Sequence, residues 1–146
     1  MAVALLDVNV LVALFDPDHV HHQPAHEWFA ANREGGWATC PLTENGFVRV
    51  LSNPAYSGRG TTVQDAAARL AVFCASGDHQ FWPDTLTLRE EGSFAFERVR
   101  GHRQITDAYL LALAAEQGGR LATFDQRIGL EAVVSATAAN LACIGA

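Results

Sequence analysis

The segment QITDAYLLALAAEQGG, residues 104–119, determines how the fold is interpreted. Every residue from Ala108 to Ala115 is apolar, which predicts a helix over 105–117 that is buried almost all round. The sequence nevertheless places Asp107 near the start of this helix, on an apolar face. A carboxylate in such a place is costly unless a partner compensates its charge. The rest of the sequence must therefore supply a partner for Asp107.

Strand and helix patterns alternate along the rest of the chain. The expected strands cover residues 3–6, 36–40, 79–83 and 120–124. The other expected helices cover residues 8–14, 25–34, 43–53, 61–76 and 86–100, while residues 131–144 show no clear pattern. Such alternation predicts an α/β domain with a mostly parallel sheet.

Composition limits the classes of function. The 146 residues suit one domain, and the formal net charge of −6 gives no general attraction to nucleic acid. A nucleic-acid role would therefore need a local basic patch or bound cations. Cys40, Cys74 and Cys143 are far apart and without CxxC spacing, which favours a reducing compartment over a disulfide framework or a zinc site. The apolar N-terminus carries Asp7 and lacks a basic region, so we expect a cytoplasmic protein without a membrane span.

Four acidic residues stand where a carboxylate is unusual. Asp7 and Asp125 each follow a predicted strand, and the carboxyl ends of parallel strands share one edge of a sheet. Glu44, like Asp107, lies on the apolar face of its helix. Taken singly, each would more often be a helix cap or a turn residue. Brought together they would repel one another, and oxygen ligands of this kind suit Mg²⁺ or Mn²⁺. A bound divalent cation is therefore the hypothesis for what compensates Asp107.

Four stretches of the chain carry a resemblance to a known family. They are LLDVNVLVAL at 5–14, PLTENGFVRVLSNP at 41–54, ITDAYLLALA at 105–114 and LATFD at 121–125. In this order they resemble the PIN-domain ribonucleases, and within them the VapC-type toxins of bacterial toxin–antitoxin pairs. The residues after about 130 match nothing in this resemblance.

The resemblance implies a single PIN domain over residues 1–146, with a central parallel sheet and helices on both faces. It also implies one pocket of catalytic, metal-binding acids, which are Asp7, Glu44, Asp107 and Asp125. Asn9 and Thr123 match polar positions that support such a pocket. Side chains of this kind hydrogen-bond to the metal ligands and orient them.

The implied activity is Mg²⁺- or Mn²⁺-dependent hydrolysis of phosphodiester bonds in structured RNA, such as tRNA or rRNA. The implied partners are a VapB-type antitoxin and a second copy of the chain in a homodimer. Sequence alone leaves open the RNA target, the number of ions and the physiological metal.

Two groups of basic side chains allow alternative interpretations. One group precedes the helix of Asp107 and comprises Arg98, Arg100, His102 and Arg103. It is either a solvated segment at a helix end or a clamp for the RNA backbone. His22 and His26 lie one helical turn apart, as in a zinc site, but Gln23 stands where an HExxH motif needs Glu.

Other classes of protein fit the sequence less well. A haloacid-dehalogenase-type phosphatase needs a second acid two residues after the first, and here that residue is Asn9. A receiver domain needs a lysine on a late strand, and the sequence contains no lysine. The non-enzymatic alternative is a catalytically silent PIN scaffold that binds an antitoxin and acts as a co-repressor, against which the four acids argue.

Overall fold

The computed structural model describes residues 2–57 and 60–145. Its strands form one parallel sheet in the order β3-β2-β1-β4-β5. Their bounds are β1 Ala4–Leu6, β2 Trp37–Thr39, β3 His79–Phe81, β4 Arg120–Thr123 and β5 Leu141–Cys143. The central strand β1 pairs with β2 through Leu5 opposite Ala38, and with β4 through Leu5 opposite Leu121. The carboxyl ends of all these strands therefore lie at one edge of the sheet.

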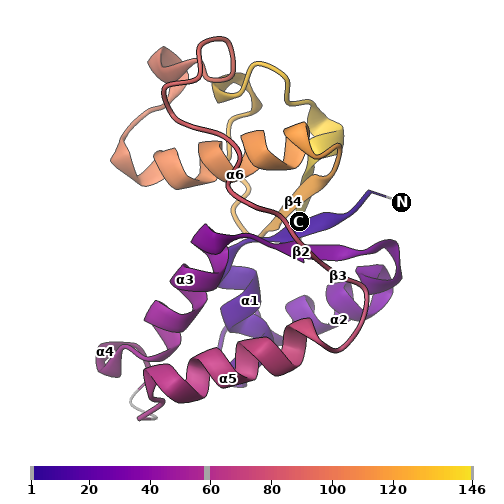
Figure 1. The fold of residues 1–146 in the computed structure, drawn as a ribbon, viewed down its shortest axis with the longest axis vertical. Coiled ribbons are helices and arrows are strands. Elements are labelled where there is room, and N and C mark those ends of the chain that lie inside the picture. Colours follow the sequence, from indigo (N-terminus) through magenta and orange to yellow (C-terminus); the bar gives the residue numbers. More distant parts are fainter. Residues whose placement is uncertain (1, 58–59, 146) are drawn as a thin grey trace.

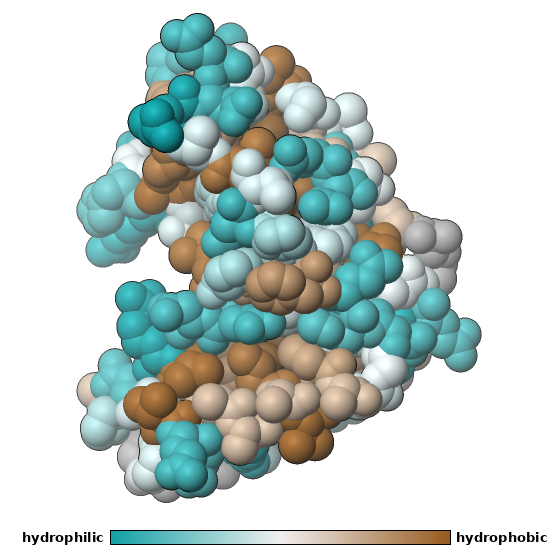
Figure 2. All heavy atoms as spheres, viewed as in Figure 1, coloured by the Kyte–Doolittle hydropathy of each residue, from teal (hydrophilic) through white to brown (hydrophobic). Residues whose placement is uncertain are grey.

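Helices cover both faces of the sheet, as predicted. Their bounds are α1 Val8–Phe15, α2 His22–Asn32, α3 Pro41–Leu51, α4 Pro54–Ser57, α5 Val63–Cys74 and α6 Ile105–Glu116. One face carries α1, α2, α3 and α5, and the other carries α6 with the C-terminal segment (Figure 1). The surface is hollowed at the left margin between these two layers (Figure 2). In the described part of the chain, no helix is long and apolar enough to cross a membrane.

The apolar core consists of two clusters, one on each face of the sheet. Alternate side chains of a strand point to opposite faces, so Leu6 and Trp37 pack against the α1–α5 layer. Leu5 and Leu121 pack instead against α6. Helix α6 is buried at every position from 108 to 114, which confirms the interpretation of this segment as a core helix.

Two parts of the chain differ from the predicted elements. The helix predicted over 86–100 is wrong, because this segment consists of irregular chain and turns, an isolated bridge from Phe94 to Val133, and one short 3₁₀ helix, Phe96–Arg98. Gly92 lies inside it with φ +87°, a conformation that breaks a helix. The unassigned C-terminal segment contributes β5, which pairs with β4 and is followed by the buried Ile144. The last residues therefore complete the sheet.

Candidate active site

Asp7 occupies the point where β1 ends and α1 begins. It caps α1: its Oδ1 accepts the backbone N–H of Val8 at 2.8 Å. Its Oδ2 accepts the hydroxyl of Thr123 at 2.9 Å. Burial raises the pKa of the Asp7 carboxyl, the two hydrogen bonds oppose this change, and the nearby Asp125 raises the pKa further. Asp7 is thus a buried acid held in one orientation by two donors.

Thr123 connects the ends of the two central strands. It is the last residue of β4 and is buried, and its hydroxyl oxygen also accepts the backbone N–H of Asp125 at 3.1 Å. Asp125 in turn accepts the backbone N–H of Arg127 at 2.8 Å. The Arg127 guanidinium lies 3.6 Å from Asp125 Oδ1, but its side chain is 91% exposed, so it neutralises little of the local charge. The supporting contact predicted for Thr123 is present.

Asp107 lies in the first turn of α6, close enough to Asp7 and Asp125 for their charges to act on its carboxyl. Burial raises the pKa of its carboxyl to about 6, with further contributions from the charges of Asp7 and Asp125. A helix start favours a carboxylate. Among the described residues, however, no hydrogen bond or ion pair reaches the Asp107 side chain. In the described part of the chain, the one ion pair of these three carboxylates is that of the exposed Arg127 with Asp125, and none reaches Asp107.

The oxygen atoms of these three carboxylates fit a hard divalent cation. Mg²⁺ and Mn²⁺ prefer such ligands, and their charge would offset both the burial and the mutual repulsion that raise these pKa values. The chemistry of these donors therefore suits the metal centre predicted at Asp7, Glu44, Asp107 and Asp125, while the oxygen atoms of the three aspartates do not all lie within 4.8 Å of one another.

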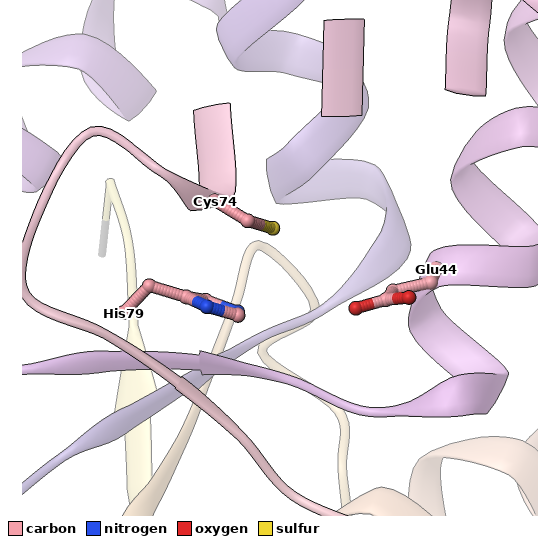
Figure 3. A group of neighbouring side chains, drawn as sticks. All are labelled: Glu44, Cys74 and His79. Atoms are coloured by element: carbon pink, nitrogen blue, oxygen red, sulfur yellow. The ribbon is translucent and has the colours of Figure 1, made fainter. Parts of the chain in front are cut away.

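Glu44 does not point at the other three acids. Its Oε2 accepts the hydroxyl of Thr39 at 2.7 Å, and its carboxylate lies beside Cys74 and His79 (Figure 3). The backbone of its helix nevertheless runs close to the pocket, because Gly46 packs against Val8, the residue after Asp7. The charges of Asp7, Asp107 and Asp125 thus act on one another, whereas Glu44 has a different hydrogen-bond partner. The pocket of four acids stays a prediction.

Asn9 also departs from its predicted place. Its side chain is exposed, and within the described residues no hydrogen bond joins it to Asp7. The first turn of α1 turns this position towards solvent, while Thr123 fills the supporting role from the neighbouring strand.

A cavity of about 600 Å³ lies beside Asp107 and Asp125. The arginines that line it are Arg98, Arg100, Arg103 and Arg127. The first three belong to the basic group for which the sequence allows either a solvated helix end or an RNA clamp. Arg127 is not in that group, because it is a single charge in a turn. His102, which was predicted with them, is not among the lining residues.

Comparison with known proteins identifies the family of the chain. The model of the PIN domain family matches residues 4–133. The chain belongs to the PIN domain family. Ribonuclease VapC44 of Mycobacterium tuberculosis is 46% identical over 141 residues, which is 97% of this chain and 99% of that protein. Ribonuclease VapC39 of the same species is 48% identical over 122 residues, 84% of this chain and 88% of its own length. The PIN domain therefore falls within the VapC ribonucleases.

A solved structure supports the fold of this PIN domain. The crystal structure of Mycobacterium tuberculosis VapC20, described as a sarcin-ricin loop cleaving toxin, superposes with a TM-score of 0.60. The match covers 89% of this chain and 98% of that one, at 18% sequence identity.

The histidine pair of this PIN domain has another explanation than zinc. The ring nitrogens of His22 and His26 lie 2.7 Å from the carbonyl oxygens of Ala13 and Leu14, respectively. Those carbonyls belong to the last turn of α1, which lacks donors of its own for them. The two imidazoles therefore cap α1 and bind it to α2.

Proposed function

We propose that this VapC-family chain is the toxin of a VapBC-type pair and a metal-dependent endoribonuclease. Its substrate would be a structured RNA in the cytoplasm, with tRNA or rRNA as the first candidates, and residues 1–146 would act as a single PIN domain. The observation that carries the proposal is the charge interaction of Asp107 with Asp7 and Asp125, with Asp107 and Asp125 lining a cavity that is rich in arginine. The relatives VapC44 and VapC39 are both named ribonucleases, which supports the same activity.

In this proposal, Asp7, Asp107 and Asp125 hold Mg²⁺ or Mn²⁺. Such an ion supplies a water of lowered pKa and positive charge opposite the scissile phosphate. Thr123 keeps the Asp7 carboxylate oriented and restrains the backbone at Asp125 through its two hydrogen bonds. Glu44 would become the fourth ligand by rotation of its side chain, because α3 already packs against the start of α1.

The arginines give this acidic chain a local attraction for RNA. The formal net charge is −6, yet four of the ten basic residues line one cavity. Arg98, Arg100 and Arg103 are exposed and can donate to phosphate oxygens, for which the guanidinium geometry is well suited. The proposed role of these residues is to hold the RNA backbone beside the carboxylates.

The proposed partners are a VapB-type antitoxin and a second copy of the chain. Apolar side chains gather over the lower layer of the molecule (Figure 2), and Val63 and Val72 of α5 are 63% and 74% exposed. An antitoxin segment that covers apolar surface and places an arginine near the carboxylates would block both metal and RNA.

The experiment that tests the proposal is RNA cleavage by the purified, antitoxin-free chain. We expect cleavage with Mg²⁺ or Mn²⁺, inhibition by EDTA, and products with 5′-phosphate and 3′-hydroxyl ends. Asp125→Asn should abolish cleavage. Activity that persists in EDTA, or products with cyclic phosphates, would refute the metal mechanism. Absence of cleavage on total RNA and on purified tRNA and rRNA would favour the silent co-repressor scaffold instead.

A further inference from the structure

A second group of metal-ligating side chains lies on the α1–α5 side of the sheet. Glu44 comes from the first turn of α3, Cys74 from the end of α5, and His79 from the start of β3. One ligand atom from each lies within 4.8 Å of the others, and all three side chains are half-buried (Figure 3). The cysteines lack the CxxC spacing of common zinc sites, and the ligands of this group come instead from three separate elements.

Thr39 holds two of these ligands in place. Its buried hydroxyl donates to Glu44 Oε2 at 2.7 Å and lies within hydrogen-bond distance of His79 Nε2, at 2.8 Å. The imidazole of His79 also packs against Trp37, with ring centroids 4.7 Å apart. The carboxylate and the imidazole are therefore already oriented towards a common point, which lowers the entropic cost of binding an ion.

Among the described residues, the carboxylate of Glu44 has no cationic partner, and no ion pair reaches it. A hydrogen-bonded cluster would satisfy the oxygen and nitrogen atoms, but it leaves this negative charge uncompensated.

We propose that Glu44, Cys74 and His79 bind a divalent ion of the zinc class. One sulfur, one nitrogen and one oxygen ligand suit Zn²⁺ and Co²⁺, whereas Mg²⁺ avoids thiolates. Zinc-bound ligand atoms lie about 3.5 Å apart, so separations of at most 4.8 Å need only small side-chain movements. The fourth position of a tetrahedral site would be filled by water.

This site would regulate the proposed nuclease through Glu44. Glu44 cannot serve both sites, so an ion held with Cys74 and His79 would withhold the fourth carboxylate from the catalytic acids. Zinc should then slow RNA cleavage. This consequence rests on the proposed function, whereas binding itself does not.

The test of binding is a Co²⁺ titration of the full chain in excess Mg²⁺, followed by absorption spectroscopy. We expect one equivalent of Co²⁺ to give a thiolate-to-cobalt charge-transfer band with the visible bands of tetrahedral cobalt. Cys74→Ser should remove the charge-transfer band, and His79→Ala should weaken binding at least about tenfold. Cys143→Ser is the matched control, since Cys143 is another half-buried free thiol and should leave the spectrum unchanged. No band in the unmodified chain, or an equal band in Cys74→Ser, would overturn the site.

The test of regulation compares each protein with itself, with and without equimolar Zn²⁺ in excess Mg²⁺. We expect zinc to reduce cleavage by the unmodified chain and by Cys143→Ser severalfold more than cleavage by Cys74→Ser. Equal inhibition of all three proteins would refute the regulatory role and assign the effect to the catalytic acids. If none of the proteins cleaves RNA, the proposed function fails, but the cobalt spectra still decide the binding site.

Discussion

Replacing Asp107 with asparagine distinguishes a metal ligand from an ordinary helix-start residue. Asparagine is nearly isosteric, so packing changes little while one negative charge disappears. The carboxyl of Asp107 has its pKa raised from 3.8 to about 6, so the folded chain holds this proton more tightly than the unfolded chain does. The free energy of unfolding should therefore fall as pH rises through the window from about 4 to 6, and the penalty is fully present above it.

The size of this penalty follows from the same pKa change. One pKa unit corresponds to about 1.4 kcal/mol, so a pKa change from 3.8 to about 6 would correspond to about 3 kcal/mol of unfolding free energy in a fully buried group. Asp107 is only half-buried, and solvent screening reduces the expected value to about 1–1.5 kcal/mol. Asp107→Asn should thus raise the melting temperature of the EDTA-treated protein by about 3–5 °C at pH 7.5, and by much less at pH 4.

Magnesium should reverse the order of the two proteins. Binding to the folded state alone stabilises by mass action, by about 2.7 kcal/mol at one hundred times the dissociation constant. The native chain should gain this stability and Asp107→Asn far less, and cleavage by the variant should collapse. The matched control is Asp65→Asn, an exposed first-turn aspartate of α5, which should lose up to about 1 kcal/mol at any Mg²⁺ concentration. An Asp107→Asn variant that is less stable than the native chain in EDTA yet still cleaves RNA would refute the assignment.

Three further predictions concern the support of the site, the sheet and the basic clamp. Thr123→Val removes both hydrogen bonds of a buried hydroxyl, so it should cost about 1–3 kcal/mol in a denaturant titration and weaken Mg²⁺ binding about 10- to 100-fold by calorimetry. Gly119→Ala would place a Cβ 2.5 Å from a backbone carbonyl oxygen and should cost about 1–3 kcal/mol, whereas Gly101→Ala, with open space around it, should cost almost nothing. Arg103→Ala should weaken RNA binding and make its salt dependence shallower by about one ion, while Arg69→Ala, at a different cavity, should change neither.

The fold could be predicted where apolar patterning is strong. Strand β1 and residues 108–115 of helix α6 are continuous hydrophobic runs, and the structure confirms both elements. The helix prediction over residues 86–100 was wrong because apolar residues scattered among turn residues have, by spacing alone, the pattern of a helix. The edge strand β5 was missed because its residues are only half-buried and too few to show a period. Its place depends on hydrogen bonds to β4 that no local pattern encodes.

The candidate site could be predicted where the backbone alone decides the position of a residue. Asp7 and Asp125 follow neighbouring parallel strands, so topology brings them to one edge whatever their side-chain rotamers. Asp107 follows from the start of a buried helix. Asn9 and Glu44 lie on helices near the predicted pocket, but the direction of their side chains depends on contacts that the sequence pattern does not show. For Glu44 the contact is the hydroxyl of Thr39, which also lies beside His79, forty residues further along the chain.

Electrostatics explains the orientation of Glu44. A fourth carboxylate beside Asp7, Asp107 and Asp125 would add repulsion to a group in which the pKa of Asp107 is already raised to about 6. Pointing the other way, Glu44 gains a hydrogen bond from the buried hydroxyl of Thr39, and such bonds to charged groups are worth about 1.5–3 kcal/mol. A cation at the three aspartates would remove the repulsion and favour rotation towards them, whereas a cation at Cys74 and His79 would strengthen the present orientation. The side chain of Glu44 is therefore the element through which two metal sites would compete, since each ion can shift its orientation only by binding one arrangement more tightly than the other.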